Sequence, residues 1–405
     1  MKILYLHQYF TTPSMSGGTR SYEMARRLVA MGHDVHVVTT WRGASERRDW
    51  WVEDIEGIHI HWLPVPYSNA MGFAQRMRAF LHFAVRAAKR AMATGGDVVF
   101  ATSTPLTIAL PAVAAARKLK RPMVFEVRDL WPLLPIAIGA LRAPWTIAAA
   151  RWLERFAYRN ADQIVALSPG MAEGVVETGY SPDRVHVIPN SCDLELFGND
   201  PRAGAAFRQQ HPELGDGPII LYAGTLGQIN GVAYLADLAS YLQHNHPGAR
   251  CVVIGGGAEE KKVVDRAVEL GVYGKNFFHY PPMSKTALVG AFQAASISLS
   301  LFIDLPEMQH NSANKFFDSL ASGRAVAINY GGWQASMIED YECGICLGYD
   351  PAMAADALAA LLHDQDRIKK MGKNARRLAE ERFDRDKLAE ELCRVLEMSS
   401  LSTAQ

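Results

Sequence analysis

The feature that most restricts the fold of this chain is a regular alternation of short apolar runs and amphipathic stretches. Residues 2–6 form the first apolar run, an amphipathic stretch follows at 19–31, and a second apolar run follows at 34–39. A strand followed by a helix, repeated in this way, is typical of a parallel sheet with helices on both faces. The sequence therefore predicts an α/β fold and excludes coiled-coil, collagen-like and disordered chains.

The alternation occurs in two successive series. The first continues with predicted strands at 58–62, 97–101, 123–127, 163–167 and 185–188, and the second has strands at 219–223, 251–254, 277–280, 297–302, 325–329 and 344–347. A polar stretch containing Gly and Pro separates them. We predict an N-terminal doubly wound domain over 1–190, a linker over 191–217 and a C-terminal doubly wound domain over 218–385, with a final helix in 386–405 assigned to the first domain.

Two such domains place ligands at the carboxyl ends of their strands and are expected to face a central cleft. The chain contains 42 basic and 42 acidic residues, but residues 1–190 carry 22 basic and 15 acidic side chains (+7), and residues 191–405 carry 20 and 27 (−7). An anionic partner is therefore expected at the N-terminal domain, where a membrane surface or an anionic acceptor fits better than a nucleic acid.

One segment of the N-terminal half, 75–90, is amphipathic, cationic and aromatic. Such a helix can lie on an anionic membrane. An ordinary surface helix that packs through Phe80 and Phe83 explains the pattern equally well. The positive charge of this half favours membrane contact slightly.

Cysteine usage and the start of the chain predict a cytoplasmic protein. Peripheral association with the inner face of the cytoplasmic membrane is compatible with this expectation. The five Cys are scattered, the first residues have a strand pattern and not that of a signal peptide, and no apolar run reaches 18 residues. Cys343 and Cys346 form a lone CxxC, for which a strand beside a loop is favoured over a metal or redox site.

Glycine-rich loops after predicted strands are candidate phosphate sites. They are Gly17-Gly18, the stretch 224–231 and the stretch 255–257. Glycines let backbone N–H groups approach a ligand, and a helix start behind them favours anions. Plain turns explain these glycines equally well. None of the loops has the GxGxxG spacing followed by an acidic residue, so a nicotinamide enzyme is not expected.

The segment 307–326 is the most informative one. Ser312 is predicted to cap a helix, which would point N–H groups at a ligand in front of it. Lys315 and Asp318 lie three residues apart, so they share a helical face on which the cation can hold a diphosphate and the carboxylate a sugar hydroxyl. A surface salt bridge between the two is the alternative.

Together, the motifs resemble glycosyltransferase family 4. In order they are Gly17-Gly18, Arg128-Asp129-Leu130-Trp131-Pro132, Pro189-Asn190-Ser191-Cys192-Asp193, the stretch 224–231, the stretch 255–259, and Asn314-Lys315-Phe316-Phe317-Asp318 with Gly323. The resemblance covers almost the whole chain. It implies a GT-B fold of two Rossmann-like domains and a retaining enzyme. The motifs around Trp131 and Lys315 are most similar to the bacterial branch that builds O-antigen and capsule, such as L-fucosamine transferases.

The resemblance also implies roles for single residues. Asp318 takes the place of the family's second glutamate, which binds the ribose, whereas the first glutamate falls on His310. The family's phosphate-binding Arg and Lys fall on Thr225 and Asn230, so we expect Lys315 to neutralise the leaving diphosphate. The remaining donor-site residues implied are Gly17, Gly18, Gly224, Gly255, Gly256, Tyr280, Pro282, Met283, Ser312 and Asn314.

The implied reaction moves a sugar with retention from a nucleotide diphosphate sugar, expected to be UDP-linked, to a saccharide or polyprenyl-diphosphate saccharide. The absence of a suitable Asp-x-Asp predicts a metal-independent site without further cofactors. We expect Asp129, near Glu126 and Arg128, to orient or deprotonate the acceptor hydroxyl; a helix cap or a pair with Arg128 is the alternative reading. Trp131 fits a sugar platform or the core. A non-hydrolysing UDP-sugar epimerase and a non-catalytic nucleotide-sugar-binding subunit remain the alternative functions.

Overall fold

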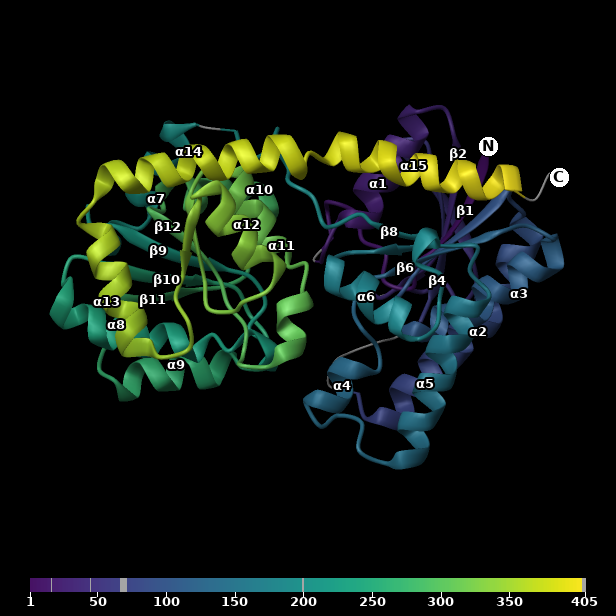
Figure 1. Ribbon diagram of the computed structural model, residues 1–405, viewed down its shortest axis with the longest axis horizontal. Helices are drawn as coiled ribbons and strands as arrows, with labels where there is room; N and C mark the ends of the chain where they lie inside the picture. Colours follow the sequence, from purple (N-terminus) through teal and green to yellow (C-terminus); the bar gives the residue numbers. More distant parts are fainter. Residues whose placement is uncertain (16, 44, 66–70, 199, 403–405) are drawn as a thin grey trace. The chain divides into compact units, whose positions relative to one another are not determined.

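The computed structural model describes residues 1–15, 17–43, 45–65, 71–198 and 200–402. The chain folds into two units (Figure 1). The first comprises residues 1–189 together with the C-terminal segment from Asp386, and the second comprises residues 190–385.

The described residues of the first unit form a sheet with the strand order β3-β4-β2-β1-β5-β6-β7-β8. These strands are β1 (Lys2–Leu6), β2 (Asp34–Trp41), β3 (Trp51–Ile55), β4 (Ile58–Pro64), β5 (Val98–Thr102), β6 (Met123–Val127), β7 (Gln163–Ala166) and β8 (Val185–Val187). All neighbours are parallel except β3, which runs antiparallel to β4. Strand order reverses between β1 and β5, so this is the switch point at which a doubly wound sheet binds its ligand.

The helices of the first unit cover both faces of this sheet. They are α1 (Arg20–Ala30), α2 (Phe73–Thr94), α3 (Ala109–Leu119), α4 (Leu133–Ala137), α5 (Pro144–Arg159), α6 (Pro169–Glu177) and α15 (Arg385–Ser402), with short 3-10 turns η1 (Leu106–Ile108) and η2 (Pro182–Arg184). Because side chains alternate along a strand, Ile3 and Tyr5 pack with α1 and α15, whereas Leu4 and Leu6 pack with α2 and α3.

The second unit contains a sheet whose described strands follow the order β11-β10-β9-β12-β13-β14, all parallel. They are β9 (Ile219–Ala223), β10 (Arg250–Ile254), β11 (Phe277–Tyr280), β12 (Ile297–Ser300), β13 (Ala325–Ile328) and β14 (Gly344–Cys346). This is the Rossmann order, and its switch point lies between β9 and β12.

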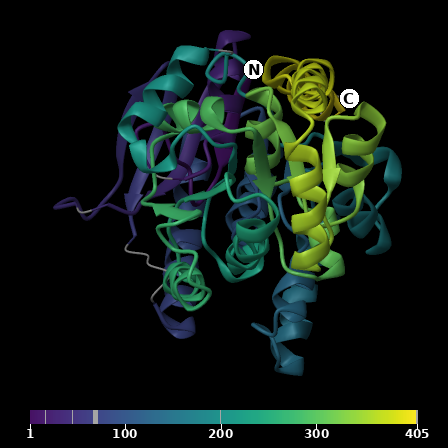
Figure 2. The same cartoon turned by 90° about the vertical axis from the view of Figure 1, so that its left-hand side faces the viewer.

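Helices connect these strands in turn. They are α7 (Pro201–Gln210), α8 (Ala233–Asn245), α9 (Glu260–Glu269), α10 (Lys285–Ala294), α11 (Asn314–Ala321), α12 (Trp333–Tyr341), α13 (Pro351–Leu362) and α14 (Gln365–Arg382), with 3-10 turns η3 (Pro212–Leu214), η4 (Gln228–Asn230) and η5 (Pro306–His310). Figure 2 views the chain from the side of α8, α9 and α13 and brings these helices of the second unit to the front.

The stretch 191–217 is not a linker, because it belongs to the second unit. It contains α7, which packs on α10 and buries Phe207. Arg208 donates to the carbonyls of Gly215, Gly217 and Ala294 and so fastens the end of this helix. Most residues of α7 are polar or small, and Phe207 is its one buried aromatic residue, so the sequence shows no apolar pattern typical of a helix there. In the CxxC, Cys343 is buried and Cys346 is exposed, and both are free thiols.

The aromatic side chains of the segment 75–90 pack inward, in agreement with the surface-helix alternative. Phe83 is buried, and the Phe80 ring lies against the Tyr9 ring. The helix α2 itself packs on α3. None of the helices within the described residues combines the length and apolar character that a membrane crossing requires.

Candidate functional site

The most distinctive charged group at the switch point of the second unit is the Lys315 ammonium. Lys315 stands in the first turn of α11, which leaves the carboxyl end of β12. Its Nζ lies 5.4 Å from the ring centre of Tyr222 on β9 and 5.1 Å from that of Phe302 after β12. The side chain runs over Gly224, since a methyl group at Gly224 would lie 2.9 Å from Lys315 Cδ. The two strands that flank the switch point therefore hold this cation between them.

Lys315 also reaches Asn230, one of the two positions at which the resemblance calls for cations, and Asn230 in turn contacts the other, Thr225. The hydrogen-bonding pattern assigns the Asn230 amide oxygen to Lys315 Nζ at 3.1 Å and the amide nitrogen to the Thr225 carbonyl at 2.9 Å. The structure thus brings Gly224, Thr225, Asn230 and Lys315 together, and the role of Lys315 toward a diphosphate stays a prediction.

Among the described residues, no carboxylate lies within ion-pair distance of Lys315. The ammonium is held by aromatic faces and one amide oxygen, and burial lowers the pKa of Lys315 to about 8. A half-buried cation without a counter-ion favours an anionic ligand, because the ligand supplies the charge that the fold leaves out.

The glycine-rich loops after β9 and β10 lie against one another. A methyl group at Gly255 would lie 1.9 Å from the Gly224 carbonyl oxygen, and one at Gly257 would lie 2.5 Å from the Leu226 carbonyl oxygen. Both glycines also have positive φ values, 155° and 154°. Loop-to-loop packing thus suffices to explain Gly255 and Gly257, whereas Gly256 faces Pro282 and the Glu260 carboxylate.

The predicted base-contact loop follows β11. The Tyr280 carbonyl already accepts the Gly255 N–H at 3.0 Å, and its hydroxyl donates to Glu213. Pro282 is exposed and Met283 is half-buried. Among the described residues, the backbone groups of Pro282 and Met283 make no hydrogen bond to the glycine-rich loops. Pro282 and Met283 are therefore better candidates than Tyr280 for backbone contact with a base.

Ser312 does not cap α11, contrary to the prediction. The helix begins at Asn314 after Ala313, and Ser312 Oγ instead accepts the Asn190 N–H at 3.1 Å while its carbonyl accepts the Asn190 amide. A partner 122 residues away therefore takes the oxygen that the local pattern assigned to the helix. Asn314 is exposed at the helix start.

Asp318 points to a different set of groups from Lys315, although the two are one turn apart. Its carboxylate lies 3.1 Å from Lys285 Nζ, which is also 3.8 Å from Asp193, and Asp193 pairs with Arg385 at 2.9 Å. The alternative of a Lys315–Asp318 salt bridge is wrong. A ribose would have to share Asp318 with Lys285.

Another carboxylate lies close to the position where the family has its first glutamate. His310 ends η5, and Glu307 stands three residues earlier in the same turn. Glu307 Oε2 is shielded from solvent and has no hydrogen-bond partner among the described residues. Glu307 was not among the predicted site residues, although a carboxylate three residues from the expected position is a usable signal.

In the first unit, Gly17 and Gly18, in the loop after β1, are exposed. Gly17 has φ +141°, and Thr11 Oγ1 donates to the Gly18 carbonyl at 2.8 Å. The exposed glycines keep their backbone accessible, as the phosphate prediction requires. Immediately upstream, His7 and Gln8 are buried with side-chain atoms that have no partner among the described residues, and burial lowers the pKa of His7 well below its ordinary value.

Asp129 is exposed just beyond β6. Its carboxylate accepts from Thr104 Oγ1 at 3.3 Å. It caps no described helix, since Pro132 precedes α4, and Trp131 packs against the core of the unit. Asp129 therefore keeps a carboxylate at the carboxyl edge of the sheet, close to the switch point.

Glu126 is not a neighbour in the site but a buried anchor. It pairs with Arg20 at 2.9 Å, with side chains 1% and 2% exposed, and accepts from Thr102 at 2.6 Å. Burial opposes its ionisation, yet the Arg20 guanidinium holds the pKa of Glu126 below its ordinary value. Arg20 also donates to the carbonyls of Ile188 and Pro189.

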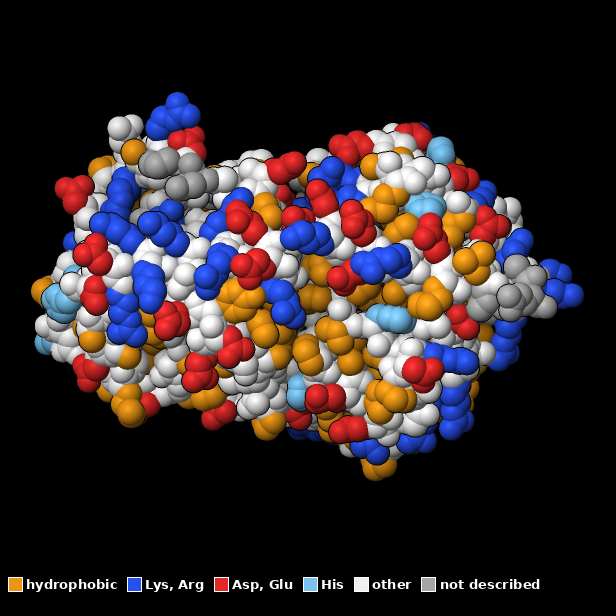
Figure 3. Space-filling model, turned by 45° about the horizontal axis from the view of Figure 1, so that its top comes forward, with side chains coloured by type: hydrophobic (Ala, Val, Ile, Leu, Met, Phe, Trp, Pro, Cys, Tyr) orange, Lys and Arg blue, Asp and Glu red, His pale blue; other side chains and the backbone are white. Residues whose placement is uncertain are grey.

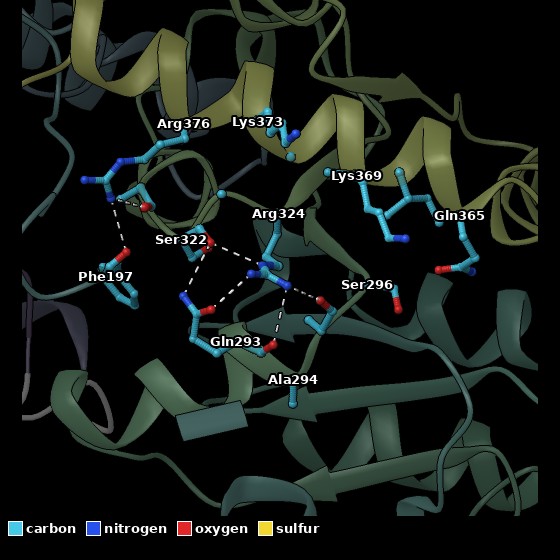
Figure 4. A pocket seen from close by; sticks show the side chains of 16 residues that line it. Phe197, Gln293, Ala294, Ser296, Ser322, Arg324, Gln365, Lys369, Lys373 and Arg376 are labelled. Atoms are coloured by element: carbon cyan, nitrogen blue, oxygen red, sulfur yellow. Dashed lines mark hydrogen bonds between the residues drawn. The ribbon is translucent and has the colours of Figure 1, made fainter. Parts of the chain in front are cut away.

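A cavity of about 690 Å³ lies elsewhere in the second unit, below α14 (Figure 4). Its half-buried cation, Arg324, donates to Gln293 Oε1 at 3.0 Å and to the Ser322 carbonyl at 3.2 Å, and Arg376 donates to the Ala321 and Phe197 carbonyls. These arginines donate to main-chain carbonyls, whereas Lys315 Nζ has no main-chain carbonyl partner among the described residues.

Comparison with known proteins shows the family to which the chain is similar. Residues 17–191 match the family model described as "Glycosyl transferase 4-like domain", and residues 205–378 match "Glycosyl transferases group 1". The chain is 29% identical over 239 residues to a D-inositol 3-phosphate glycosyltransferase of Xylanimonas cellulosilytica, covering 56% of this chain and 55% of that one. It is 26% identical to an alpha-maltose-1-phosphate synthase of Mycolicibacterium smegmatis, covering 67% and 71%.

The fold resembles that of HepE from Anabaena in complex with UDP and glucose, with a TM-score of 0.76, 15% identity and coverage of 98% of this chain and 100% of that one. The chain spans about half the length of the first of the curated relatives. The two family models together account for most of the sequence, and the expected GT-B fold is confirmed. The chain therefore belongs to the family of glycosyltransferases with a 4-like domain followed by a group 1 domain.

Proposed function

We propose that this chain transfers a sugar from a nucleotide diphosphate sugar, with the diphosphate bound beside Lys315. The observation that carries the proposal is the Lys315 ammonium at the β9/β12 switch point, without a carboxylate partner among the described residues. The family assignment supports transfer as the reaction, and the complex of HepE with UDP supports UDP as the first nucleotide to test.

In the proposed reaction the bond between the anomeric carbon and the diphosphate oxygen breaks while the acceptor oxygen bonds to the same carbon. The leaving diphosphate gains negative charge. Lys315 stabilises this charge, and the partial burial of Lys315 strengthens the interaction. Retention of configuration, taken from the family resemblance, places the acceptor on the face that the diphosphate leaves. The acceptor proton then passes to the leaving phosphate, and Asp129 orients the acceptor hydroxyl.

For the acceptor we propose a saccharide or a polyprenyl-diphosphate saccharide of surface polysaccharide synthesis. The motif around Asp129 and Trp131 supports this class, whereas the curated relatives are named for inositol 3-phosphate and maltose-1-phosphate. Transfer assays with both classes of acceptor separate these possibilities. Transfer to inositol 3-phosphate alone would contradict the acceptor proposed here and leave the donor site in place.

The donor site is tested by calorimetry with UDP, GDP and ADP on the full chain. For UDP we expect Lys315→Ala to weaken binding by about 2 kcal/mol, roughly thirtyfold, because one member of a desolvated charge pair is lost. Lys373→Ala is the matched control, since Lys373 lies on α14 beside the separate cavity below that helix. Equal affinity of wild type and Lys315→Ala for every nucleotide would refute the site.

A further inference from the structure

An exposed aromatic stripe on α5 has no role in the donor site. Trp145 and Trp152 are 72% and 60% exposed, the largest exposed fractions among the described aromatic side chains. Together with Ala149 and Phe156 they recur at helical spacing, so they lie along one side of the helix. Phe156 stacks on Trp152, with ring centres 5.3 Å apart and an interplanar angle of 18°.

Arginines flank this stripe on the same helix. Arg151, Arg155 and Arg159 are exposed, and among the described residues no carboxylate lies within ion-pair distance of them. The one acidic residue of the helix, Glu154, is half-buried and hydrogen-bonded to Tyr158. Burial raises the pKa of Glu154 to about 7, so at neutral pH this one carboxyl is only about half ionised beside the three arginines.

The cationic character of α5 distinguishes it from α14, another surface helix rich in basic residues. On α14 and its surroundings, basic side chains have acidic partners, as in Lys370–Glu342, Arg376–Glu380 and Arg377–Glu381. Figure 3 shows basic and acidic side chains interspersed on the face that carries α14. In contrast, the exposed arginines of α5 have no carboxylate within ion-pair distance in the described part of the chain, and they lie beside exposed tryptophans.

The position of α5 leaves the stripe accessible within its unit. In Figure 1, α4 and the beginning of α5 project from the lower end of the first unit, and Figure 2 shows the same blue-teal helix projecting. A groove of about 640 Å³ runs beside the helix between Trp152, Arg151 and Arg155. Leu133, on α4, is also exposed.

We propose that α5 docks the chain on an anionic phospholipid membrane, with Trp145 and Trp152 in the interface and Arg151, Arg155 and Arg159 on lipid headgroups. Aromatic side chains with an apolar body and a polar N–H are favoured at this interface, and arginine is attracted to anionic headgroups. A second copy of the chain is a poorer occupant, because a symmetric contact between two α5 helices would oppose like charges. This inference deepens the lipid-linked acceptor of the proposed function.

The test is cosedimentation of the full chain with vesicles of phosphatidylcholine alone and of phosphatidylcholine with phosphatidylglycerol, without donor or acceptor. We expect binding to the anionic vesicles, about tenfold weaker for Trp145→Ala/Trp152→Ala and about fivefold weaker for each arginine removed. Added salt should weaken binding of the wild type and have less effect once Arg155 and Arg159 are replaced by Ser.

Leu81→Ala/Val85→Ala on α2 is the matched control, since these side chains are 48% and 59% exposed on the other cationic helix. Loss of binding in this control with binding intact in the α5 variants would overturn the proposal, as would absence of vesicle binding in the wild type. A change from dimer to monomer in Trp145→Ala/Trp152→Ala without lipid would assign the stripe to self-association. UDP affinity of the same variants keeps a failed membrane site distinct from a failed donor site.

Discussion

Each unit carries a cation in the first turn of a helix at the carboxyl edge of its sheet, and the two cations have opposite surroundings. Arg20 at the start of α1 is paired with Glu126 and with two carbonyls. Lys315 near the start of α11 has aromatic rings and an amide around it. At similar positions in the two sheets, Arg20 therefore holds the segment at Ile188 and Pro189 in place, whereas the charge of Lys315 is available to a ligand.

The comparison predicts the largest effect for Glu126→Ala. Removing the carboxylate leaves Arg20 buried without its counter-charge, and we expect the first unit to lose about 3–5 kcal/mol of unfolding free energy. Urea denaturation followed by tryptophan emission measures this change. Trp333 is the one Trp of the second unit, so the other seven Trp of the chain report on the first unit. Asp49→Ala, which breaks an exposed pair with Arg86, is the control and should leave the curve unchanged.

Lys315→Met should have the opposite effect from Glu126→Ala, because it should preserve stability and weaken nucleotide binding. Because burial disfavours the charged amine, an apolar side chain of similar length should keep the unfolding free energy of the second unit at or above the wild-type value. UDP affinity should fall roughly thirtyfold in calorimetry. A marked loss of stability, seen in the emission of Trp333, would mean that Lys315 serves the fold as Arg20 does.

The pH dependence of nucleotide binding sharpens the same contrast. The pKa of free Lys315 is about 8, so the cation is present below this pH and is lost as the pH rises through it. UDP affinity should therefore decrease above pH 8, by up to about tenfold per pH unit. Lys315→Ala should show a flat profile between pH 7 and 9, and an equally steep profile in that variant would assign the titration to another group.

The smallest effect is expected at Asp318, which shares its carboxylate with Lys285. Asp318→Asn should weaken UDP binding by only a few-fold, since an amide still accepts a ribose hydroxyl bond. Lys285→Ala frees Asp318 for the ribose and should leave UDP affinity equal or higher. A larger loss in Lys285→Ala than in Asp318→Asn would show that Lys285 itself contacts the nucleotide.

The sequence was sufficient to predict the two doubly wound sheets, because buried parallel strands leave apolar runs such as the one at β1. It did not reveal β3, whose residues are mostly exposed and therefore form no apolar run. The helix α7 was mistaken for a linker for a similar reason, since Phe207 is its one strongly buried aromatic residue.

At the site, residue types were predictable and their partners were not. Lys315 was predicted from its position in the motif, but its surroundings, which hold no carboxylate among the described residues, depend on β9 and β12, which lie far apart in the sequence. Ser312 was assigned the wrong role because Asn190 takes its hydroxyl oxygen. The exposed tryptophans of α5 were overlooked because periodicity shows that a helix has an apolar side, not whether another element covers it.

The helix α15 has a consequence for biosynthesis. Leu388, Leu392 and Leu396 complete the core around Ile3 and Tyr5, yet they are translated after every residue of the second unit. During synthesis, the first unit therefore cannot complete its hydrophobic core until the residues of α15 have been translated. By then the second unit, which is encoded later than most of the first, already has all its residues. The order of translation and the order of completion are thus reversed in this chain.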